Sequence, residues 1–146
     1  MRTTALVSLV AALGVAACAT QHRERVSLPA EKNALWRSEC GACHQAFPPM
    51  MLTVGNWQAM MRELEQHFGE DASLDEASRQ EIAAYLQRNG APDSYGRHSA
   101  SSLRITDTAY FQRRHKGSSV PLWRRTGENK PSNCPACHKA SDEQLW

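Results

Sequence analysis

One five-residue pattern, C-x-x-C-H, occurs twice in this chain of 146 residues and constrains it more than any other feature. The first copy runs from Cys40 to His44 and the second from Cys134 to His138. This spacing is typical of haem c attachment, because two thiols form thioethers to the haem vinyl groups while the histidine reaches the iron from one face. The sequence therefore predicts two haem c groups, with these attachment residues and proximal iron ligands: Cys40, Cys43, Cys134 and Cys137, and His44 and His138.

The same cysteines have a second interpretation, which is a structural zinc site or a pair of disulfides. A zinc ribbon places its two C-x-x-C units about 15–20 residues apart. Here ninety residues separate Cys43 from Cys134, and a ribbon does not need a histidine at the same place in both units. The haem interpretation is therefore favoured.

The first 18 residues have the pattern of a signal peptide that ends in a bacterial lipobox. The apolar run Ala5–Ala17 is too short to span a bilayer and has the length of a signal-peptide core. In the lipobox interpretation of Val15–Cys18, Cys18 becomes the lipidated first residue and holds the protein on a membrane surface. The alternative is ordinary cleavage after Ala19, which removes Cys18. Both alternatives export the chain to the periplasm.

After the signal peptide we expect a tether over 19–30 and a di-haem domain over 31–146. The domain is predicted to consist of a first haem segment, a linker and a second haem segment, at 31–92, 93–104 and 105–146. The first haem segment carries a net charge of −4 and the rest of the domain +4. This polarity fits either the orientation of a redox partner or an ordinary solvated surface. The basic residues are dispersed and match no nucleic-acid-binding motif, so no nucleic-acid binding is expected.

The mature chain predicts an all-α fold, small and mostly helical, with long loops and with the haems forming much of the core. No Val- or Ile-rich alternating run suggests a strand. Helices are expected over 30–46, ended by Pro48 and Pro49; over 57–68, capped by Asn56; from a capping box at Ser73 to Asn89; and from a cap at Thr106 or Asp107 to His115.

The distal ligand of the first iron is predicted to be His67. In the expected helix over 57–68, His67 falls on the apolar stripe that begins at Trp57, and a histidine on such a face is a strong ligand candidate in a chain that already binds haem. Methionine is the alternative, from Met50, Met51 or Met60, although filling gaps in the core is its commoner use.

The distal ligand of the second iron is predicted to be His115, because no methionine follows position 61. His115 ends an expected short helix, with Phe111 one turn earlier on the same face. The alternatives are His98, which lies in an expected flexible loop where a surface role is the simpler interpretation, and an unligated or water-bound iron. A crossed arrangement, with His67 on the second iron and His115 on the first, is also open.

The chain resembles the bacterial di-haem cytochrome c (DHC) family over most of residues 35–140. The residues that carry the resemblance are Trp36–His44, Trp57 with Met60, His67–Ala72, Ile82–Leu86 and Asn133–His138. The resemblance implies bis-histidine ligation at both irons, in agreement with His67 and His115. It also implies electron exchange with redox partners, among them a small oxygen-binding monohaem cytochrome and membrane b-type cytochromes.

The function expected from the sequence is electron transport by an exported, membrane-tethered carrier, not an enzyme. Two imidazoles on each iron leave no open coordination site for a substrate. Two alternatives remain open. One is a small haem enzyme, a peroxidase or a reductase subunit, with one open iron. The other is a haem-containing sensor or accessory subunit of a membrane redox complex.

Overall fold

The computed structural model of the protein describes residues 31–116, 131–136 and 138. The predicted signal peptide and tether (1–30), Cys18 and Cys137 lie outside these residues. The elements follow in the order α1 (Ala34–Cys40), η1 (Pro49–Met51), α2 (Val54–Arg62), η2 (Leu64–Gln66), α3 (Glu76–Asn89), η3 (Gly96–His98), η4 (Ile105–Asp107), α4 (Ala109–His115) and η5 (Cys134–Ala136), where η is a 3₁₀ helix.

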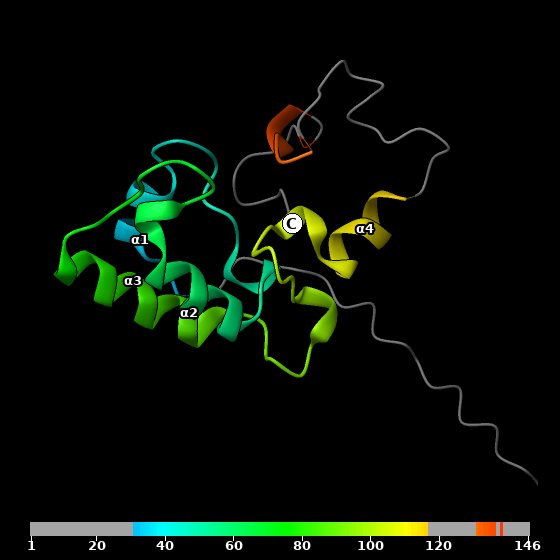
Figure 1. Ribbon diagram of the computed structural model, residues 1–146, viewed down its shortest axis with the longest axis horizontal. Helices are drawn as coiled ribbons and strands as arrows, with labels where there is room; N and C mark the ends of the chain where they lie inside the picture. The colour runs from blue at the N-terminus through cyan, green and yellow to red at the C-terminus, as the bar shows by residue number, and fades with distance from the viewer. Residues whose placement is uncertain (1–30, 117–130, 137, 139–146) are drawn as a thin grey trace, which may run out of the picture.

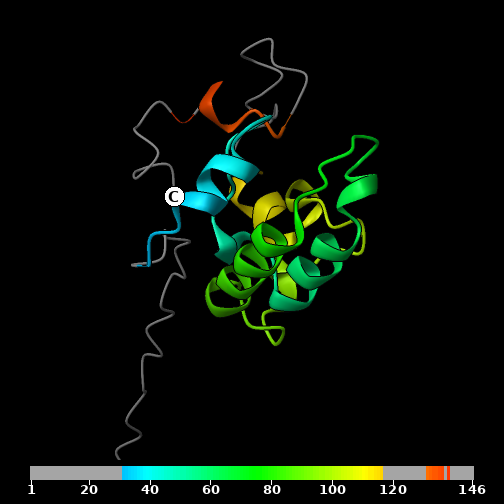
Figure 2. The same cartoon turned by 90° about the vertical axis from the view of Figure 1, so that its left-hand side faces the viewer.

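The all-α prediction is confirmed, since the described ranges contain only helices, turns and two isolated β-bridges. Figures 1 and 2 show α2 and α3 side by side, with α1 across one end of the pair and α4 on the other side of the molecule. None of the helices in the described ranges has the length and apolarity that crossing a membrane requires.

Helix α1 is shorter than predicted, because it covers 34–40 instead of 30–46. Its N-cap is Asn33, whose side chain accepts a hydrogen bond from the Trp36 amide at 2.6 Å. The helix ends at Gly41, well before the prolines that were expected to stop it. Pro49 instead begins η1, where a missing N–H is tolerated. The first attachment cysteine therefore closes α1, and the other residues of the motif lie in the loop that follows.

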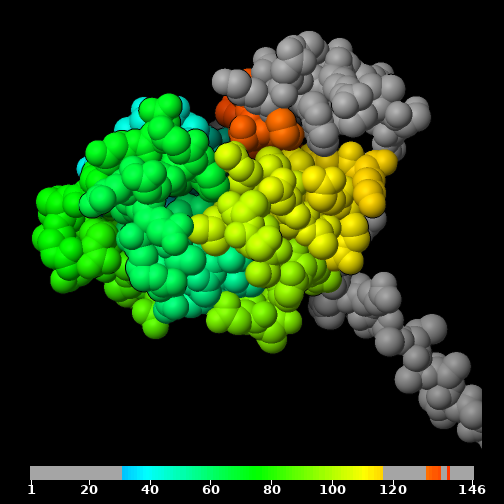
Figure 3. All heavy atoms as spheres, in the orientation of Figure 1, coloured from blue at the N-terminus to red at the C-terminus, as the bar shows by residue number. Residues whose placement is uncertain are grey.

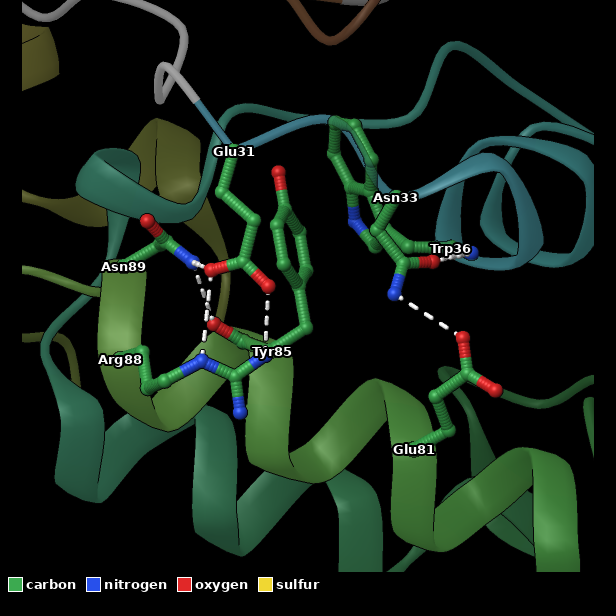
Figure 4. A network of polar contacts seen from close by, with 7 residues as sticks. All are labelled: Glu31, Asn33, Trp36, Glu81, Tyr85, Arg88 and Asn89. Carbon is green, nitrogen blue, oxygen red and sulfur yellow. Dashed lines mark hydrogen bonds and ion pairs between the residues drawn. The ribbon is translucent and has the colours of Figure 1, made fainter.

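Polar contacts hold the start of α1 against α3 (Figure 4). Glu31 accepts hydrogen bonds from Arg88 at 2.5 Å and from Asn89 at 3.0 Å. Asn33 donates to Glu81 at 3.1 Å. These contacts lie at the surface and contribute modestly to stability, but they align Trp36 with Tyr85. The rings of these two residues lie 5.3 Å apart.

The apolar core consists of ten buried side chains from the helices and the segments between them: Trp36, Met51, Leu52, Trp57, Met61, Ile82, Tyr85, Leu86, Ile105 and Phe111.

Helix α2 also differs from the prediction of 57–68. It begins after its N-cap Thr53, whose side-chain hydroxyl accepts a hydrogen bond from the Asn56 amide, and it ends at Arg62. Asn56 is not the cap, because its side chain pairs with both the amide and the carbonyl of Ala100. The apolar stripe is real, since Trp57 and Met61 are buried on it, but the helix stops before it reaches His67.

Helix α3 ends at Asn89 as predicted and is followed by Gly90. It begins one residue after Asp75, whose carboxylate accepts hydrogen bonds from the amides of Ala77 and Ser78. The capping role expected of Ser73 therefore belongs to Asp75.

Residues 93–104, predicted as a linker, are attached closely to the start of α2. Thr53 donates a backbone hydrogen bond to the His98 carbonyl at 3.3 Å, and Gly55 donates to the Asp93 carboxylate at 2.8 Å. The flexible surface position expected for His98 is wrong, because its side chain is fully buried. Its ring lies 4.3 Å from the ring of Tyr110 in α4, at an angle of 26°. The segment thus packs α4 against the first helices.

Helix α4 begins one or two residues later than predicted and ends at His115 as expected. Its N-cap is Thr108, which accepts a hydrogen bond from the Phe111 amide at 3.1 Å and donates one to the Ile105 carbonyl at 2.7 Å. The short η5 lies near α4 and apart from α2 and α3 (Figures 1 and 3).

Candidate functional site

The first attachment motif combines a partly buried and an exposed thiol. Cys40, at the end of α1, packs against the apolar core, whereas Cys43 is exposed in the loop that follows. Burial, with a smaller contribution from Glu39, raises the pKa of the Cys40 thiol to about 11. Neither of these two cysteines is in a disulfide, as thioether formation requires.

His44 directly follows the second thiol, and its ring is oriented by the backbone. Nδ1 lies 2.8 Å from the Gln45 carbonyl oxygen. A carbonyl only accepts hydrogen bonds, so Nδ1 carries the proton and the lone pair is on Nε2. Such a hydrogen bond is characteristic of metal-binding histidines, because it fixes the tautomer and raises the basicity of the ligand.

His67 begins a tight turn after η2. The Glu70 amide donates to the His67 carbonyl at 3.1 Å, and both central residues have positive φ, 57° at Phe68 and 104° at Gly69. This combination corresponds to the mirror-image turn that normally connects antiparallel strands. The expected helix over 57–68 does not reach this turn, because α2 ends at Arg62. The φ of Gly69 suits a turn glycine, and the turn, not an apolar helix face, presents His67.

The rings of His44 and His67 are separated by a distance that suits a metal between them. Their centroids lie 6.2 Å apart, with 24° between the planes. A metal–imidazole bond is about 2 Å and the ring centre lies roughly 1 Å beyond the nitrogen, so an iron bound end-on by two imidazoles requires a centroid separation of about 6 Å. The side chains present therefore fit a haem iron held from both sides.

The second site has the same spacing from different elements. His115, the last residue of α4, and His138 have ring centroids 6.3 Å apart, with 69° between the planes. The angle is compatible with a shared metal, because an imidazole rotates freely about its bond to the metal. Nδ1 of His115 lies 2.8 Å from the Phe111 carbonyl, which leaves Nε2 as the available ligand atom.

The Phe111 and His115 rings stack at 3.9 Å, as expected for side chains one turn apart on one face of α4. Cys134 opens η5 as a half-buried thiol, and the His138 amide donates to its carbonyl at 2.8 Å. This turn brings the first thiol and the histidine of the second motif together.

The electrostatic environment keeps candidate ligands neutral, as metal binding requires. Burial lowers the pKa of His67, and the charges of His44 and Arg104 lower it further. Burial also lowers the pKa of His138, with a second contribution from His115. Within the described residues, no three His, Cys, Asp or Glu side chains gather as they would around a zinc ion.

The alternative ligands occupy other places. His98 is buried beside Tyr110, and desolvation and then the charge of Arg97 lower its pKa. Met51 belongs to the buried core, and Met50 and Met60 pack against it. The structure therefore pairs His44 with His67 and His115 with His138.

The sequence did not indicate two residues beside His67. The Phe68 ring lies 4.8 Å from that of His67, and the Arg104 guanidinium lies 4.2 Å from the Phe68 ring centre. The contact joins residues far apart in the chain, so no local periodicity of the sequence predicts it. The available signal was Gly69, because a glycine favours a turn with positive φ at this point.

Comparisons with known proteins show which family the chain resembles. The family model described as dihaem cytochrome c matches residues 36–146. Two solved structures from Rhodobacter sphaeroides, one of DHC and one of a diheme cytochrome c, resemble the chain at TM-scores of 0.65 and 0.66, with 39% and 40% identity. The two alignments cover 80% and 79% of this chain, and they cover 98% and 97% of the two Rhodobacter sphaeroides chains.

A diheme cytochrome c (sb-DHC) from Shewanella baltica OS155 is similar at a TM-score of 0.58 and 34% identity. The alignment covers 73% of this chain and 80% of that one. The search of curated proteins found no match.

Proposed function

Because this chain belongs to the dihaem cytochrome c family and carries two c-type haems, we propose that it is an exported electron carrier with two imidazole ligands on each iron. The family supports electron transfer through haem as the general function. The bis-histidine ligation and the periplasmic location are the specific parts of this proposal.

The observation that carries the proposal is the presence of two separate histidine pairs with nearly equal ring separations, 6.2 Å and 6.3 Å. We assign His44 and His67 to the first iron and His138 and His115 to the second. The covalent links are assigned to the two motifs, through Cys40, Cys43, Cys134 and Cys137.

The chain's own groups define what each haem does. The haem supplies a one-electron Fe(III)/Fe(II) couple. His44 and His115 donate Nδ1–H to backbone carbonyls, which strengthens each imidazole as a ligand and favours Fe(III), so we expect low reduction potentials at both sites. With both axial positions filled, neither iron has room for a substrate, which supports a carrier over a peroxidase or reductase.

Cytochromes c of such families are typically exported, and the signal-peptide pattern of 1–18 supports the same location here. Retention on a membrane through a lipidated Cys18 is part of the proposal. As partners we propose a small monohaem cytochrome and a membrane b-type cytochrome, which the family resemblance implies.

Ligation is tested by electron paramagnetic resonance of the oxidised protein and by carbon monoxide added to the reduced protein. The wild type is expected to show only low-spin iron and to bind no carbon monoxide. His67→Ala and His115→Ala should each open one iron, giving one high-spin signal and one equivalent of bound carbon monoxide.

His98→Gln is the matched control, because it alters a buried histidine that the proposal does not place on an iron. It should retain both low-spin signals. Prompt carbon monoxide binding by the wild type would contradict the carrier proposal and favour an enzyme. Loss of a low-spin signal in His98→Gln, with His115→Ala unchanged, would contradict the assignment of His115.

A further inference from the structure

Arg104 and Phe68 form a stacked pair beside the first candidate iron site. The guanidinium carbon lies 4.2 Å from the ring centre, well within the range of a cation–π contact. The Phe68 ring also lies 4.8 Å from the His67 ring. The aromatic ring therefore connects a permanent positive charge to an imidazole that we assign to iron.

Backbone that is unfavourable for the residue type occurs at Phe68 and directly before Arg104. Phe68 has a φ of 57° and Leu103 has a φ of 58°, whereas Arg104 itself is extended. A bulky residue in the left-handed region is strained, and such conformations concentrate at functional sites. Phe68 remains 43% exposed, so burial of its ring does not account for its presence in this turn.

We propose that Arg104, held over Phe68, is a positioning residue that raises the reduction potential of the first haem relative to the same site without this charge. The inference rests on the proposed ligation of that iron by His67. Reduction adds one negative charge to the site, and a nearby fixed cation stabilises the reduced form more than the oxidised form. The charge of Arg104 also contributes to lowering the pKa of His67, in agreement with their proximity.

The exposure of Arg104 limits the expected change in the reduction potential. Arg104 is exposed, so solvent and salt reduce its interaction with the iron. We expect a three- to tenfold change in the equilibrium constant for reducing the first haem, which for one electron corresponds to about 30–60 mV. The second haem should be nearly unaffected, because Arg104 contacts the turn that follows η2 and not the candidate ligands of the second site.

The test is a potentiometric titration of the full-length holoprotein, followed through the haem methyl signals in the NMR spectrum. The signals of the first haem are identified as those displaced in His67→Ala. Arg104→Gln is expected to lower the midpoint of the first haem alone, with a smaller shift at high salt. Arg104→Lys keeps the charge and should retain most of the potential.

Arg79→Gln is the matched control, because it removes the same charge from α3, where Arg79 pairs with Glu76 at 2.7 Å. It should leave both midpoints unchanged. Phe68→Asn removes the aromatic ring but suits a positive φ better, so the fold should persist while part of the potential shift is lost.

Two failures are distinguishable. If Arg104→Gln keeps both low-spin signals and neither midpoint moves, or if both move equally, the role of Arg104 is overturned while the ligation stands. If the wild type lacks a bis-imidazole signal at the first haem, the ligation proposal fails, and the inference about Arg104 fails with it.

Discussion

The two candidate haem sites have the same ligand spacing but very different support. The first lies beside a core in which α1, α2 and α3 pack around Trp36 and Tyr85, and polar contacts at the start of α1 reinforce that packing. The second joins the seven-residue α4 to a short motif segment over 131–138. Helix α4 is held through Phe111, which belongs to the same core, so the weaker support concerns the motif segment with its three-residue η5.

The difference indicates that the first site is formed mainly by the polypeptide, whereas the second depends more on its cofactor. In the first site, Phe47 in the loop after His44 and Leu64 shortly before His67 pack against the core. In the second, a covalently bound haem would itself join α4 to the motif. We therefore expect the two halves to respond differently to the same kind of change.

Removal of the second haem should produce the largest effect. In Cys134→Ala/Cys137→Ala we expect one haem per chain, loss of order around α4 and little loss of the helical signal from α1–α3. Haem content by the pyridine haemochrome assay and helicity by circular dichroism measure these outcomes. The matched variant Cys40→Ala/Cys43→Ala removes the first haem. Complete unfolding after loss of the second haem alone would show that the comparison is wrong.

The second-largest effect is expected when the side chain of Trp36, in the core, is truncated. Trp36 is 4% exposed and stacks against Tyr85, so Trp36→Ala leaves a large cavity and should lower the free energy of unfolding by about 3–5 kcal/mol. Denaturant titration of the holoprotein gives this quantity. Tyr95→Ala, at an aromatic residue that is 41% exposed, is the control and should change the free energy much less.

Loss of the α4 cap should be smaller and confined to the second site. Thr108 is buried and bonds both the Phe111 amide and the Ile105 carbonyl. Thr108→Ala should cost about 1–2 kcal/mol and increase carbon monoxide access at the second iron only. Thr106→Ala, a neighbour that does not cap α4, serves as the control. Equal disturbance of both haems would mean that the two sites are not independent.

The smallest expected effect is a pH dependence at the contact between the halves. The pKa of His98 is lowered, first by burial and then by Arg97, with Arg113 acting in the same direction and backbone hydrogen bonds at Met50 and Met51 opposing it. An unfolded histidine binds a proton near pH 6.5, but the folded one resists protonation. Stability should therefore fall as the pH drops below about 6.5.

Denaturant titrations of the oxidised holoprotein at pH 8 and pH 5.5 measure this dependence. In His98→Gln the histidine contribution is absent, so the difference between the two pH values should be smaller than in the wild type. An unchanged difference would show that His98 does not couple folding to protonation.

The sequence predicted the fold class and the general chemistry, because both depend on local signals. Two C-x-x-C-H motifs are sufficient for the haem prediction, and the predicted end of the third helix at Asn89 is confirmed by α3. The N-caps were less predictable, since several polar residues precede each helix. Thr53 caps α2 because Asn56 is engaged by Ala100, a partner 44 positions away that periodicity does not reveal.

The prediction of His67 as an iron ligand rested on a helix that does not extend to this residue. The stripe that begins at Trp57 was extended past Arg62, where α2 ends, yet the turn after η2 still places His67 opposite His44. His98 shows the opposite error. Its Ser-, Gly- and Arg-rich surroundings suggest exposure, but backbone pairing with Thr53 buries it.

The partly buried thiol at the end of α1 has a consequence for biosynthesis. A cysteine whose pKa is about 11 is almost entirely protonated at neutral pH, and a protonated thiol is a poor nucleophile. Once the helices have closed around it, Cys40 is therefore a slow reactant for the vinyl group. Maturation is favoured when the cofactor is joined to the nascent, still extended polypeptide, and the ordered protein forms afterwards around what it already carries.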